Sequence, residues 1–167
     1  MSATPPRWED RPLWHVTLPW RRPPLMANDT GRLAASMADR ARTRDDVCLL
    51  ARSLRLQPIT VPVVAILTWY TNTRQVTDSD NIAPTLKRCL DGLRLARVLA
   101  DDTARHVVFT GQRVYLRDRH PYGVGSPARV ILSLYDGSTF SLPHVDPSPP
   151  ATLAAQASLL STPAPMG

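Results

Sequence analysis

Hydrophobic and polar residues along the first half of the chain predict a strand, a long helix and a second strand. The segment LWHVTLPW, residues 13–20, predicts the first strand. A helix is expected over residues 31–54, capped by Asn or Asp at positions 28–29. The β-branched segment 59–70 predicts the second strand, where Pro62 favours an edge position or a bulge. The expected buried stripe of the helix consists of Leu33, Met37, Val47, Leu50 and Leu54.

The second half of the chain predicts one further helix and two further strands. The helix begins near Pro84, because proline suits the first helical turn. Its leucines at positions 86, 90 and 93 recur at i, i+4 and i+7 and are expected to face the core, with positions 87, 91 and 94 on the other side. HVVFTGQRVYLRD (106–118) and ARVILSLYD (128–136) predict the strands. The order β-α-β-α-β-β indicates a small single α/β (α+β) domain, a mixed β-sheet flanked by helices.

The two ends of the chain differ in composition from this core. Residues 1–12 are polar and proline-punctuated. Residues 143–167 are rich in Pro, Ala and Ser and hold six of the 17 prolines, a composition typical of disordered segments. We therefore expect a flexible N-terminus (1–12), a folded domain (13–142) and a disordered tail (143–167).

Charge narrows the possible partners. The net charge of +6 and the pI near 10.1 favour a polyanionic partner such as nucleic acid. Lys87 is the one lysine and Glu9 the one glutamate, so acid–base or metal chemistry would have to use aspartate or histidine. No run of about 18 apolar residues predicts a membrane span, and the N-terminus lacks the apolar segment of a secretory signal. Cys48 and Cys89 form no CxxC pair and indicate thiols of an intracellular protein.

Acidic residues gather around the one lysine, between Thr77 and Asp102. Asp78 and Asp80 follow the long strand at i and i+2, and in extended backbone such side chains point to the same face. A strand–helix–turn path can return Asp102 beside them. Three carboxylates in one place form a hard oxygen site suited to Mg²⁺ or Mn²⁺. Lys87 could then reach a phosphate at the metal.

Each of these residues also has an ordinary structural interpretation. Asp80 and Asn81 precede a helix and could cap it. Lys87 and Asp91 stand at i and i+4 and could form a surface ion pair that contributes a few tenths of a kcal/mol, roughly. The segment ADDT that begins at position 100 could be a turn.

Taken together, the segment resembles the RusA family of Holliday junction resolvases. That family's motif is a D-x-D-N sequence, a lysine, D-x-L four residues later and an acidic pair ten residues further on. Here DSDN (78–81), Lys87, DGL (91–93) and ADD (100–102) reproduce the order and these two intervals. The interval from Asn81 to Lys87 is three residues longer than in the best-known members. The resemblance covers roughly Leu13 to Leu134.

The resemblance implies a cytoplasmic, homodimeric and Mg²⁺-dependent endodeoxyribonuclease of DNA recombination and repair. Such an enzyme would cut four-way DNA junctions symmetrically, with Mn²⁺ as a possible substitute ion. Carried over residue by residue, Asp78, Asp80 and Asp102 would be the metal ligands and members of the catalytic set. Lys87 would stabilise charge on the phosphate or the leaving oxygen. The supporting residues would be Asn81, Asp91 and Asp101.

Two other functions fit the same residues. One is a catalytically silent DNA- or RNA-binding protein that keeps the scaffold and its charge. The other is a nuclease for forks or flaps rather than junctions. For the expected dimer, the segments 31–54 and 59–70 carry the most apolar surface, so part of one of them is expected at a two-fold interface.

Overall fold

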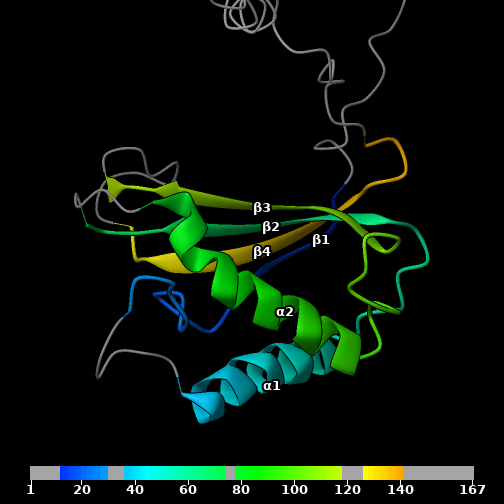
Figure 1. Ribbon diagram of the computed structural model, residues 1–167, viewed down its shortest axis with the longest axis horizontal. Helices are drawn as coiled ribbons and strands as arrows, with labels where there is room; N and C mark the ends of the chain where they lie inside the picture. Colours follow the sequence, from blue (N-terminus) through cyan, green and yellow to red (C-terminus); the bar gives the residue numbers. More distant parts are fainter. Residues whose placement is uncertain (1–11, 30–35, 74–77, 118–125, 141–167) are drawn as a thin grey trace, which may run out of the picture.

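The computed structural model describes residues 12–29, 36–73, 78–117 and 126–140, and it shows one four-stranded sheet with two α-helices (Figure 1). This arrangement confirms the expected mixed-sheet α+β domain and the order β-α-β-α-β-β, to which a 3₁₀ turn is added. The elements in chain order are β1 (Pro12–Thr17), α1 (Met37–Ser53), β2 (Val63–Tyr70), η3 (Ser79–Ile82), α2 (Ala83–Leu95), β3 (Val107–Tyr115) and β4 (Arg129–Asp136).

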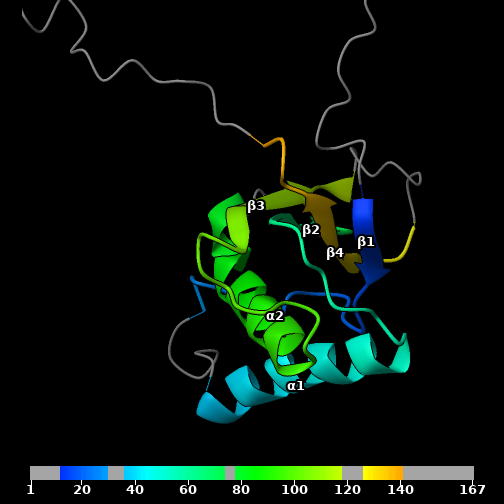
Figure 2. The ribbon, with the colours of Figure 1, turned by 90° about the vertical axis from the view of Figure 1, so that its right-hand side faces the viewer.

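The strands lie in the order β1-β4-β2-β3. β4 pairs antiparallel with both β1 and β2, whereas β2 and β3 are parallel. Parallel neighbours need a crossover connection, and α2 provides it here. Both helices lie on the same side of the sheet, and α1 crosses α2 (Figure 2).

The core forms between the helices and the facing side of the sheet. The predicted leucines of α2, Leu86, Leu90 and Leu93, are all buried, as expected. Where α1 and α2 cross, a Cβ placed on Gly92 would lie 2.5 Å from the carbonyl oxygen of Arg44 and 2.9 Å from the Cβ of Val47. The glycine of the DGL segment is therefore required by close helix packing.

The first helix begins later than the sequence predicts. Ser36 is its N-cap, and a capping box joins Ser36 and Asp39: the Ser36 Oγ accepts from the Asp39 N–H at 3.1 Å. The expected caps at 28–29 are therefore wrong. Of the expected stripe, Val47 is buried and Leu50 packs against the core, whereas Met37 and Leu54 are 79% and 49% exposed. Leu33 lies outside the described residues.

The second strand is shorter than predicted and is not an edge strand. β2 begins at Val63, directly after Pro62, and lies between β4 and β3. Proline cannot donate to a ladder, so a strand that pairs on both sides begins after it. The expected irregularity is present next to this proline, because the β2–β3 register shifts between Val63 and Val64.

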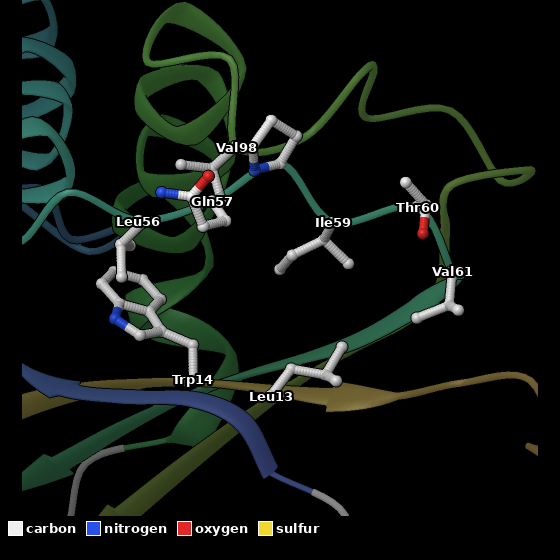
Figure 3. A pocket seen from close by; sticks show the side chains of 9 residues that line it. Leu13, Trp14, Leu56, Gln57, Ile59, Thr60, Val61 and Val98 are labelled. Atoms are coloured by element: carbon white, nitrogen blue, oxygen red, sulfur yellow. The ribbon is translucent and has the colours of Figure 1, made fainter.

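An apolar pocket of about 360 Å³ lies between the start of β1 and the segment that follows α1 (Figure 3). Leu13 and Trp14 of β1 face Leu56 and Ile59 across it. Its lining contains no acidic or basic side chain, so this pocket is separate from the charged residues that the sequence singles out.

The expectations for the two ends of the chain lie mainly outside the described residues, since residues 1–11 and 141–167 are not among them. Within the part of the chain that the structure describes, no helix is both long and apolar enough to cross a membrane.

Candidate functional site

The first two candidate aspartates, Asp78 and Asp80, lie at the start of the crossover to α2. Asp78 has extended backbone (φ −64°, ψ 138°), but Asp80 belongs to the 3₁₀ turn η3. The expectation that both side chains share a face through extended backbone is therefore wrong. Both residues are exposed. Neither caps η3 or α2 through a side-chain hydrogen bond.

Asn81 has a different role from the expected cap. It is buried, with 6% exposure, and its Oδ1 accepts from the Asn28 backbone N–H at 2.7 Å. Its own carbonyl oxygen accepts from the Ala27 N–H at 2.8 Å. Asn81 thus fixes the segment after β1 against the start of α2.

Lys87, Asp91 and Asp102 are brought together on the surface. The Lys87 Nζ lies 3.3 Å from Asp91 Oδ1, one helical turn along α2, and also donates to Asp102 Oδ2 in a close ion pair. Asp102 comes from the segment that follows α2 and contacts Lys87, an ion pair that the sequence does not predict. The expected return of Asp102 was to Asp78 and Asp80. The predicted Lys87–Asp91 surface pair is confirmed as well. A cation now stands between two carboxylates from different parts of the chain.

Two arginines, at positions 88 and 94, pair with the acidic residues at positions 91 and 101. Arg88 Nη1 lies 2.8 Å from Asp91 Oδ2, so Asp91 is shared between Lys87 and Arg88. Asp101 Oδ1 accepts from the Asp102 backbone N–H at 2.9 Å and lies 3.7 Å from Arg94 Nη1. Asp91 thus contacts the lysine and Asp101 contacts the turn, and their supporting role in a site stays a prediction.

Lys87 and Asp102 shift each other's pKa values. The hydrogen bond from Lys87 lowers the pKa of Asp102, against a smaller opposing effect of burial. The hydrogen bond to Asp102 raises the pKa of Lys87, with Asp91 adding in the same direction. Each group favours the charged form of the other, so both are ionised at neutral pH.

Carboxylate oxygens are the ligands that Mg²⁺ prefers, so the donor chemistry of Asp78, Asp80 and Asp102 suits that ion. The structure does not, however, group these carboxylates as a metal site. Among the described residues, no group of three or more His, Cys, Asp or Glu side chains is placed to hold a metal ion. One oxygen of Asp102 is engaged by the Lys87 ammonium instead. The structure brings Asp102 to Lys87 without assembling the expected three-carboxylate set.

Arg88 is a site residue that the sequence does not single out. It is one of many arginines, and only its i, i+3 spacing to Asp91 could have indicated the contact. No protein-family model matches this chain, and no curated protein matches it either.

Proposed function

We propose that this protein is a metal-dependent endodeoxyribonuclease that resolves four-way (Holliday) junctions by paired, symmetric incision. One observation supports it most: the one lysine of the chain is held between Asp91 and Asp102, at the spacing that resembles the RusA motif. A lysine beside carboxylates on an exposed helix face suits phosphodiester chemistry, in which developing negative charge must be stabilised. The net charge of +6 supports a DNA substrate.

In this proposal each residue has a distinct part. Asp78, Asp80 and Asp102 would hold Mg²⁺, which supplies Lewis-acid activation of the phosphate and of water. Lys87 would leave Asp102 and donate to a phosphate oxygen. Asp91 would keep the ammonium near the site during this movement, since it contacts Lys87 from the preceding turn of α2.

Lys87 can exchange Asp102 for a phosphate oxygen as its hydrogen-bond partner. Its side chain is 55% exposed, so it is free to turn toward an incoming phosphate. Asp78, Asp80 and Asp102 would hold the divalent cation, whose charge would neutralise these carboxylates. Lys87 would then be available to donate to the phosphate.

Symmetric incision calls for two sites, so we propose a homodimer that acts in the cytoplasm. Of the two elements expected at the interface, β2 is an internal strand that is buried along nearly its whole length. α1 carries the exposed apolar side chains Met37 and Leu49, which makes it the better candidate. A stable two-fold interface of standard size buries roughly 1,200–2,000 Å² in total.

The test is cleavage of labelled four-way, forked and linear DNA by the purified protein, with Mg²⁺ or with EDTA. We expect paired nicks in the four-way junction with Mg²⁺ and none with EDTA. Preference for forked DNA would instead identify a fork or flap nuclease. Absence of cleavage with Mg²⁺ and with Mn²⁺ would contradict the proposed activity.

A catalytically silent DNA- or RNA-binding protein is the second candidate. The observation that favours it is the ion pair itself, because Lys87 already neutralises the carboxylate that a metal would need. Such a protein would bind nucleic acid equally well with Mg²⁺ and with EDTA, and it would leave every substrate intact.

A further inference from the structure

A charged pocket of about 270 Å³ is lined in part by Lys87. Three parts of the fold form it: the segment 25–29 after β1, the start of α1 and the first turns of α2. Arg40 contributes from α1, and Lys87 and Arg88 contribute from α2. Because Lys87 pairs with Asp102 and Arg88 pairs with Asp91, the pocket and the acidic cluster share two side chains.

The wall of this pocket is fixed before any ligand arrives. Thr85 on α2 donates from its Oγ1 to the Leu25 carbonyl at 2.6 Å and accepts from the Leu25 N–H at 3.0 Å. One turn earlier, Asn81 accepts from the backbone N–H groups of Ala27 and Asn28. These four hydrogen bonds tie the segment to η3 and α2, so the backbone of this wall loses little conformational entropy on binding.

The charges that line the pocket are mainly positive. Its three basic side chains face one acid, Asp29, whose Oδ1 is 2.9 Å from Arg22 Nη2. Arg88 is held by Asp91. Arg40 has no ion pair with any acid of the described residues. The pocket thus presents an arginine fork, which can bind two oxygens of one phosphate.

We propose that this pocket binds a phosphate of the DNA backbone adjacent to the phosphate at Lys87, with Arg40 as the main contact. The inference rests on the proposed function for its ligand, since it extends the DNA path from the acidic cluster along α2 to α1. A phosphate here would fix the register of the strand relative to Lys87. Arg40 is therefore a positioning residue for the substrate, and it takes no part in the chemistry.

The test measures binding separately from cutting. Fluorescence anisotropy with labelled four-way DNA in EDTA gives the affinity at several salt concentrations. We expect Arg40→Ala to weaken binding severalfold and to reduce the slope of log affinity against log salt by about one, because one phosphate contact is lost. Arg40→Lys should restore the slope and only part of the affinity, since lysine keeps the charge without the fork.

Arg42→Ala is the matched control, because Arg42 is exposed on the same helix and does not line the pocket. Equal losses in Arg40→Ala and Arg42→Ala would overturn the subsite and leave only a general charge effect. Unchanged binding by Arg40→Ala in a wild-type protein that cuts junctions would overturn the subsite and leave the nuclease standing. An Arg40-dependent affinity in a protein that never cuts would retain the subsite and refute the nuclease.

Discussion

The candidate site has two groups of aspartates, and the fold holds them differently. Asp91 and Asp102 are mostly covered, with side-chain exposures of 12% and 17%, and both contact Lys87. Asp78 and Asp80 lie exposed where the chain enters α2. Asp91 and Asp102 are held by ion pairs that need no ligand. Among the described residues, no ion pair or side-chain hydrogen bond positions Asp78 or Asp80. A shared cation would make the two groups dependent on each other.

The largest expected effect comes from replacing the aspartates one at a time. We expect Asp102→Asn, Asp78→Asn and Asp80→Asn each to abolish junction cleavage, because each removes one anionic ligand of the same ion. DNA binding in EDTA should be unchanged or tighter, since less negative charge faces the phosphates. Cleavage by Asp78→Asn and Asp80→Asn at the wild-type rate would show that the exposed pair is outside the site.

Replacing the lysine should have the next largest effect. Lys87→Ala should lower the cleavage rate at saturating DNA by about 10²-fold, as is found for loss of a single donor to transition-state charge. Single-turnover cleavage measures this rate independently of affinity. Lys87→Arg is the control that keeps the charge. If Lys87→Ala changes the affinity alone, the lysine is a docking contact.

A third prediction disturbs the packing of α2 against α1 and changes no charged residue. Gly92→Val would press its side chain into the Arg44 carbonyl and Val47, and we expect a loss of about 2–3 kcal/mol in the free energy of unfolding. Urea denaturation measures it. Gly137→Val is a useful comparison, because a Cβ there would meet Val108 and Pro62 away from α2. Wild-type stability of Gly92→Val would mean that the helices have room to separate.

The smallest expected effect is on stability at acid pH. Because the pKa of Asp102 is lowered in the folded protein, its pairing with Lys87 stabilises the fold above the ordinary value of 3.8. This contribution is lost as pH falls through the folded pKa. Melting temperatures in EDTA should therefore fall less steeply below pH 3.8 for Asp102→Asn than for the wild type. Lys87→Ala should flatten the curve similarly, and an unchanged slope in both would contradict the pairing.

The elements set by local pattern were predictable from the sequence. The leucine spacing of α2 gave its buried face, and Pro84 gave its start, because both signals act within one or two turns. The start of α1 also has a local signal, the capping box of Ser36 and Asp39, which the expected caps at 28–29 overlook. The apolar residues of α1 do not mark its buried face as the leucines of α2 do, because Met37 and Leu54 are exposed at its two ends.

The candidate site was predictable only in part, because its contacts cross the chain. The contact of Asp102 with Lys87 was not predicted, because the expected strand–helix–turn path returned Asp102 to Asp78 and Asp80. The 3₁₀ turn at Asp80 removed the geometry expected for the first pair. The partner of Asn81 is 53 residues away, at Asn28, a distance over which residue spacing carries no information.

The place of β4 in the sheet has a consequence for biosynthesis. β1 ends at Thr17, yet its partner in the described sheet is β4, which begins at Arg129. A ribosome therefore releases β1, both helices and the parallel β2–β3 pair before the strand that joins β1 to them. Until then the edges of β1 and β2 that pair with β4 stay open, and open strand edges are sites for association with other nascent chains. Late insertion of β4 is the step at which this fold is most exposed to misassembly.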